Sequence, residues 1–193
     1  MSMGFHRISV RHITRGNIPP MIASVLLFAF LSVPCLAHTI EYRAPIDHMG
    51  RLDKKAQVSL SRFLGHFRAD FLFHGALSTQ VVDTLGGYPF PPKLIGHNTY
   101  LIYSFRPNDA TNKGAVVITS SGKVLLAALG SFQCGLYPGI AFPSSVRAFV
   151  RSTRNLRYLP AIKTWALLYC HRYALHLYSL RCAKRNIKDC PLR

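Results

Sequence analysis

The chain has 193 residues, 49% of them hydrophobic, and carries 24 Lys and Arg against seven Asp and Glu, a formal net charge of +17. This length allows one domain with a real hydrophobic core. So few acids leave little material for the paired carboxylates of hydrolytic enzymes, while the positive charge favours anionic partners or surfaces.

The first 37 residues have the pattern of a cleavable signal peptide. A basic segment precedes an apolar run from Met21 to Val33, and the small residue Ala37 offers a cleavage site. The run is shorter than the ~20 residues of a membrane-spanning helix, which disfavours an uncleaved anchor. A lipoprotein is disfavoured because Pro34 precedes Cys35, where lipid modification prefers a small residue. We expect a mature chain from His38, exported to the periplasm or secreted.

The remaining charge is uneven along the mature chain. Residues 38–134 hold ten basic and six acidic residues, whereas residues 135–193 hold eleven basic residues and one acid. We therefore expect one domain over 38–134 and a basic, Cys-containing tail over 135–193. The tail has no clean periodicity, so out-of-frame translation is one explanation for it and a genuine extension is the other.

Four cysteines follow the signal peptide, at positions 134, 170, 182 and 190. In an oxidising compartment they can form two disulfides, and the sequence leaves all three pairings open. We expect no bridge across the central sheet, because all four cysteines lie in the tail or at its border. Zinc is the alternative, with His171 and His176 as further ligands, but the spacing lacks the tight pairs of zinc sites. We expect no metal and no cofactor.

Two helices are predicted before the central strands. Apolar residues recur at helical spacing after Asp53, which can cap the helix, and Gly65 weakens the case for one continuous helix. These apolar positions are Val58, Leu60, Phe63, Leu64, Phe67, Phe71 and Leu72. A second helix is predicted over 77–85, ended by Gly86 and Gly87, and the prolines of residues 88–92 exclude regular structure there.

Three strands are then predicted, over 98–105, 115–119 and 124–129, because these segments are rich in β-branched and aromatic residues. Residues 120–123 suit a tight hairpin, and residues 106–114 a long loop. The expected fold is α+β, with one or two N-terminal helices packed on an antiparallel meander that has a long hairpin loop.

The tail offers weaker patterns. Arginines at 147, 151, 154 and 157 would share one face of a helix. Residues 165–180 are apolar enough for a helix, and the basic residues among them argue against a membrane span.

Enzyme motifs are missing from the sequence. It has no phosphate-binding glycine loop, no GxSxG elbow and no HExxH motif, and its histidines are dispersed. We therefore expect a binding protein and not an enzyme.

The sharpest candidate binding site is the predicted loop at 105–110, which holds a cation, an amide and an acid beside a proline. A rigid polar protrusion of this kind can enter a cleft with little loss of conformational entropy. An ordinary solvated turn has the same composition. The candidate residues are Phe105, Arg106, Pro107, Asn108, Asp109 and Ala110.

The stretch GHNTYLIYSFRPNDATNKGAVVI, residues 96–118, resembles the signature region of the inhibitor of vertebrate lysozyme (Ivy) family. That family has a strand with Gly-x-x-x-Tyr near its start, then Ser and the loop motif C-K-P-H-D-C. Here Thr99 and Tyr100 begin the strand, and Pro107 and Asp109 match the loop motif. The likeness extends over about residues 69–130.

The loop also departs from the family pattern. Phe105 and Ala110 stand where the family has two disulfide-bonded cysteines that brace the loop. Asn108 stands where the family has the His that meets the catalytic carboxylates of lysozyme, and Arg106 replaces Lys. The family's strand-bearing segment after the meander is not recognisable after Gly130.

The resemblance implies inhibition of a c-type lysozyme by insertion of the 105–110 loop, with no nucleic acid as partner. One alternative is a basic envelope protein that binds anionic surfaces through its tail. Another is a degenerate, inactive relative of the inhibitors. A homodimer stays open.

Overall fold

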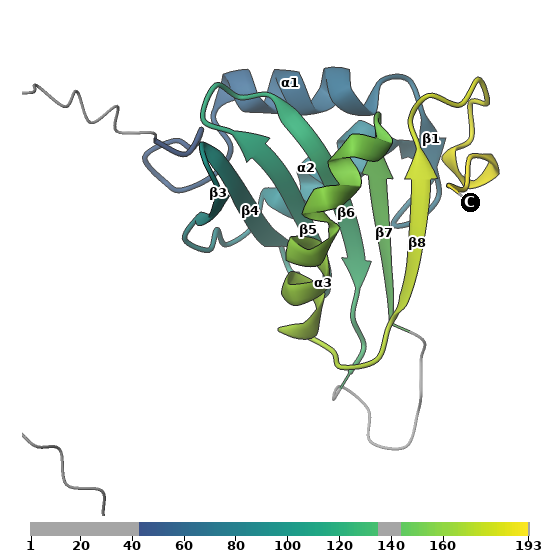
Figure 1. The fold of residues 1–193 in the computed structure, drawn as a ribbon. Helices are drawn as coiled ribbons and strands as arrows, with labels where there is room; N and C mark the ends of the chain where they lie inside the picture. Colours follow the sequence, from purple (N-terminus) through teal and green to yellow (C-terminus); the bar gives the residue numbers. More distant parts are fainter. Residues whose placement is uncertain (1–42, 135–143, 193) are drawn as a thin grey trace, which may run out of the picture. The chain divides into compact units, whose positions relative to one another are not determined.

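The predicted strands lie at the centre of a six-stranded sheet in the computed structural model, which describes residues 43–134 and 144–192 (Figure 1). The sheet order is β3-β4-β5-β6-β7-β8, antiparallel throughout except for the parallel pair β7 and β8. The strands are β3 (Lys93–Gly96), β4 (Thr99–Arg106), β5 (Asp109–Thr119), β6 (Val124–Ser131), β7 (Ser145–Val150) and β8 (Ala174–Ser179). The α+β prediction is confirmed. The signal-peptide prediction falls on residues outside the described part.

Two helices, α1 (Lys54–Leu64) and α2 (Leu77–Leu85), cover one face of the sheet, and α3 (Leu159–Leu167) covers the other (Figure 1). Short elements complete the domain: β1 (Arg68–Ala69), β2 (Gly75–Ala76) and the 3-10 turns η1 (Thr153–Tyr158) and η2 (Ile187–Asp189). Neither α1, α2 nor α3 is long and apolar enough to cross a bilayer, and no other helix in the described residues is either.

Helix α1 begins as predicted but ends sooner. The Asp53 carboxylate accepts a hydrogen bond from the Ala56 N–H at 2.7 Å, so the predicted cap is confirmed. Gly65 has φ 64°, a left-handed conformation that stops the helix. Phe67 and Phe71 follow outside the helix and still join the core on this face of the sheet. Helix α2 has the predicted bounds.

The central strands are buried on both sides. In β5, Val116 and Ile118 pack toward α1 and α2, whereas Ala115 and Val117 pack toward α3. Strands between two helical layers have near-continuous apolar sequences, as β4, β5 and β6 have here. The sheet therefore needs a helix on each face.

The segment after residue 143 supplies that second layer, contrary to both helix predictions for the tail. The arginine spacing does not mark a helix, because Val146, Ala148 and Val150 alternate along β7 and face α3. The apolar stretch predicted as one helix is divided between the end of α3 and β8. Residues on both sides of position 134 thus share one sheet, and the fully buried Trp165 and Phe149 belong to its two cores.

Two disulfides are present, Cys134–Cys170 and Cys182–Cys190. The first joins the segment that leaves β6 to the segment after α3. No cysteine of either bridge lies in a strand, so neither bridge ties strands of the sheet together, as expected. The second closes the C-terminal turn. Disulfides are typical of oxidising compartments.

Both edges of the sheet are short or occupied. The outer side of β8 pairs with the C-terminal residues, because Ser179 N–H donates to Cys190 O and Leu192 N–H donates to Leu177 O. At the opposite edge, β3 has four residues and a register shift against β4.

Replacing Phe149 by Ala tests whether the C-terminal half is integral to the core. Phe149 is fully buried, so the variant should lose about 3–5 kcal/mol of unfolding free energy, measured by urea denaturation. The control is Leu168→Ala, at a side chain that is 64% exposed, which should stay within about 0.5 kcal/mol of the unsubstituted protein. Equal effects of the two substitutions would contradict this packing.

Candidate functional site

The predicted loop is a tight turn between β4 and β5. Arg106 and Asp109 pair across the strands, which leaves Pro107 and Asn108 as the corner. Asn108 has φ 58°, and Pro followed by a residue with positive φ is the pattern of a type II turn. The prediction of a long loop through Gly114 is therefore wrong, because the polar residues after the turn belong to β5.

A bulge in β5 shapes the tip of the hairpin, which comprises residues 105–110. The register shifts between the pairs Phe105–Lys113 and Arg106–Asp109, so three extra residues lie on β5. The Asp109 carboxylate accepts hydrogen bonds from Thr111 Oγ1 and Asn112 Nδ2, each at 2.6 Å, and from the Thr111 N–H at 3.0 Å. Burial raises the pKa of Asp109, but these hydrogen bonds outweigh it and hold that pKa below 3.8. Asp109 is therefore a stable anion that organises the bulge.

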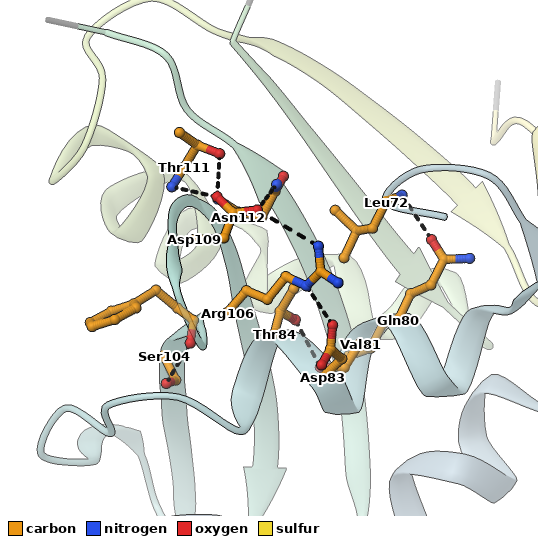
Figure 2. A network of polar contacts seen from close by, with 11 residues as sticks. Leu72, Gln80, Val81, Asp83, Thr84, Ser104, Arg106, Asp109, Thr111 and Asn112 are labelled. Atoms are coloured by element: carbon orange, nitrogen blue, oxygen red, sulfur yellow. Dashed lines mark hydrogen bonds and ion pairs between the residues drawn. The ribbon is translucent and has the colours of Figure 1, made fainter. Parts of the chain in front are cut away.

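Arg106 fastens the tip to the end of α2 (Figure 2). Its Nε donates to Asp83 Oδ2 at 2.7 Å, and one terminal nitrogen lies 3.8 Å from Asp109 Oδ2. Its guanidinium also lies 5.8 Å from the centre of the Phe73 ring. The two charges that the sequence marked as candidate contacts are thus engaged with each other and with α2.

Lys113 holds the tip from the other side of the hairpin. Its side chain is buried, and its Nζ donates to the Ala110 carbonyl at 2.5 Å and lies 5.4 Å from the centre of the Phe105 ring. The Tyr169 ring lies on it as well, at 4.3 Å, and burial raises the pKa of that phenol to about 12, so the ring stays neutral. One ammonium therefore contacts both positions at which the resembled family has its bracing cysteines.

The segment after α2 packs closely against the end of β4. A Cβ on Gly87 would collide with the Phe105 carbonyl, so only glycine fits there. Ser104 Oγ donates to the Tyr88 carbonyl at 2.7 Å, and the Tyr88 and Phe105 rings stack 6.2 Å apart. Gly86 and Gly87 were expected only to end α2. Gly87 also allows the backbone to pass close to Phe105.

An open groove of about 1090 Å³ runs between this segment and the tip. Its most exposed apolar side chains are Tyr88, which is 77% exposed, and Met49, which is 55% exposed. Arg51 also lines the groove. Sequence analysis missed Met49 and Arg51, since their segment has no pattern that links it to a loop sixty residues away.

The six predicted site residues therefore divide by role. Pro107, Asn108 and Ala110 are exposed at the tip, whereas Phe105, Arg106 and Asp109 are partly buried in the contacts that hold it. Asn108 is the polar side chain that the corner presents to solvent.

The described residues include no group of three or more His, Cys, Asp and Glu able to hold a metal ion. At the tip, the carboxylates of Asp83 and Asp109 are both paired with Arg106. The tip therefore presents an exposed corner beside an open groove on an α+β domain. Comparison with protein-family models, characterised proteins and solved structures gives no match to this chain.

Replacing Lys113 by Met tests the ammonium brace. Met keeps most of the buried volume but loses the hydrogen bond to Ala110, so amide exchange over 109–112 should accelerate by about tenfold. Global stability should change little, because the variant also no longer buries a charge. Unchanged exchange at the tip, measured by hydrogen–deuterium exchange, would show that Lys113 does not brace it.

Replacing Asp109 by Asn tests the role of its charge. Because the folded-state pKa of Asp109 is lowered, its stabilising contribution is present above pH 3.8 and is lost as the pH falls through the folded-state pKa. The variant should be about 1–3 kcal/mol less stable at neutral pH, and the difference should narrow below pH 3.8. Urea unfolding at both pH values measures it, with the exposed Asp189→Asn as control. A difference independent of pH would contradict the ionic role.

Proposed function

We propose that this protein is an exported, periplasmic or secreted inhibitor of a c-type lysozyme, and that it inserts the tip of the β4–β5 hairpin into the enzyme's cleft. The observation that carries this proposal is the self-braced tip, with Pro107 and Asn108 at its corner. The residues from Ser104 to Ala110 are the segment whose sequence resembles the inhibitory loop of the Ivy family.

Rigidity supports the proposal. The tip is held by the Arg106 ion pairs, by the hydrogen bonds to Asp109 and by the contacts of Lys113. Because these contacts form within the protein itself, little conformational entropy remains to be lost when the tip enters a cleft. In this proposal, the contacts within the protein take the place of the disulfide that braces the loop in the Ivy family.

Asn108 is the residue that would reach the catalytic carboxylates. Its side-chain amide can donate a hydrogen bond to a carboxylate without carrying charge. Arg106 and Asp109 act in this proposal as positioning residues, since their charged groups are already engaged.

The groove beside the tip would supply contact area. Exposed aromatic and Met side chains at the centre of an interface contribute much of its affinity, and Tyr88 and Met49 are of this kind. We therefore include both residues in the proposed contact surface.

Long-range electrostatic repulsion should slow association with this partner. Lysozymes of the resembled target class are basic and this chain is strongly basic too, so the two proteins repel at a distance. Salt screens that repulsion, so association should be faster at higher ionic strength. Attraction to an anionic surface would have the opposite salt dependence.

Substitutions of Asn108 test the proposal directly, in a titration of lysozyme activity on cell walls. N108G removes the amide and keeps a residue that tolerates positive φ, and the inhibition constant should rise about tenfold or more. N108D, which would place a carboxylate against carboxylates, should weaken inhibition further. N108H restores the residue of the family motif and should strengthen inhibition below about pH 6.5, where imidazole is charged.

The matched control is His171→Gly, a substitution at an exposed residue outside the tip. Absence of inhibition by the protein from residue 38 onward would overturn the proposal. Inhibition that is equal for all Asn108 variants would place the contact elsewhere on the molecule.

A further inference from the structure

The outward face of α1 carries positive charge without any acid. The helix sequence KKAQVSLSRFL includes three basic residues, and Lys54, Lys55 and Arg62 are all exposed. Lys54, Val58 and Arg62 follow each other at intervals of four residues, so they lie on one stripe of the helix. The face is thus a line of two cations with an apolar residue between them.

A groove of about 740 Å³ beside this stripe extends the charge onto the sheet. Lys54, Lys55 and Arg62 line it from α1, and Lys123 lines it from the turn between β5 and β6. Ser59 and Ser121 add hydroxyl groups to the lining, which contains no carboxylate. None of the four cations forms an ion pair within the described residues.

This arrangement is not explained by the stability of the domain. Two lysines in the first turn oppose the helix macrodipole, which favours acids there, and only the Asp53 cap offsets them. Cations gathered in one groove also repel one another. An anionic partner outside the domain would relieve both effects.

The apolar residue at the centre of the charge narrows the kind of partner. Val58 is 43% exposed, and a second groove of about 480 Å³ on the α2 side is also lined by Lys54, Val58 and Arg62. Val58 therefore stands as a ridge between two cation-lined grooves. A helix with an apolar ridge flanked by basic residues suits the interface of a bilayer, where headgroups meet the cations and the ridge enters the boundary of the acyl chains.

From this surface we infer that the protein docks on anionic phospholipid membranes through α1, with Lys54, Lys55, Arg62 and Lys123 on the headgroups and Val58 inserted. Two cations of the basic tail are engaged within the domain, because Arg147 lies 4.7 Å over the Phe71 ring and Arg151 donates to the carbonyls of Arg62 and Phe63. Other basic residues of the tail are exposed, and the control variant below tests two of them. Docking through α1 is independent of the hairpin tip and does not require lysozyme inhibition.

A matched pair of double variants tests the inference, using the protein from residue 38 onward with vesicles of mixed phosphatidylglycerol and phosphatidylcholine. Each basic residue close to an anionic bilayer contributes about fivefold in binding, so K54Q/R62Q should bind about 25-fold more weakly. The control K163Q/R172Q removes one Lys and one Arg that are exposed on the α3 side, and should bind within about twofold of the unsubstituted protein. Circular dichroism verifies that each variant is folded.

Orientation is tested by V58W. The native Trp165 is buried, so its emission should not respond to vesicles, whereas an indole at position 58 should shift to shorter wavelength as it enters the interface. No shift in V58W while the protein binds vesicles would show that another face makes the contact.

Three further results would overturn the inference. These are equal losses in the two double variants, binding to pure phosphatidylcholine that is as strong as to the anionic mixture, and binding that persists at an ionic strength of about 1 M, where the Debye length is about 3 Å. Preferential binding to DNA over anionic vesicles, lost in K54Q/R62Q, would assign the same surface to nucleic acid instead.

Discussion

Strands β4, β5 and β6 carry apolar side chains on both faces, and this requirement for cover on two sides organises the whole domain. Helices α1 and α2 shield one face, and α3 shields the other. A chain that ended after β6 would leave the second face open to water and the β6 edge unpaired. The C-terminal segment therefore completes the domain and is not an appendage, and the Cys134–Cys170 disulfide joins its helix to the strand layer.

The hairpin tip shows how charges in a short polar segment can serve structure before they serve recognition. Arg106 and Asp109 lie at adjacent cross-strand positions, and with Asp83 they form a small ionic network that ties the tip to α2. The cost of ordering these side chains is met within the isolated protein, so a partner meets a tip that is already shaped. In the proposed interaction, the parts left for recognition are the corner, with Asn108, and the exposed side chains of Tyr88 and Met49.

Local signals predicted much of the N-terminal half. Asp53 as a cap, the end of α2 at Leu85 and the three central strands follow from residue type and spacing over a few positions. The predictions were wrong where contacts with distant residues determine the secondary structure. Arg147 and Arg151 suggested a helix by their spacing, but β7 is a strand because Val146 and Ala148 pair beside β6 and pack on α3. Similarly, the polar run from Thr111 to Gly114 reads as a loop, and only its pairing with two neighbouring strands makes it part of β5.

The candidate site was found only in part for the same reason. Its corner residues are consecutive, so they could be recognised together, whereas Met49, Gly87 and Lys113 reach the tip from separate segments. Lys113 is the clearest example, because a lone lysine in a polar stretch has no sequence signal for burial between Phe105 and Tyr169.

The two edges of the sheet affect how readily the protein aggregates. Exposed edge strands act as templates on which other chains polymerise. Here the C-terminal residues pair with the outer side of β8 at Leu177 and Ser179, and β3 is short and irregular. Self-association by extension of the sheet is thereby blocked at one end and weakened at the other. A concentrated deposit of this protein at a surface would consequently resist conversion into fibrillar aggregates for as long as its last few residues stay in place.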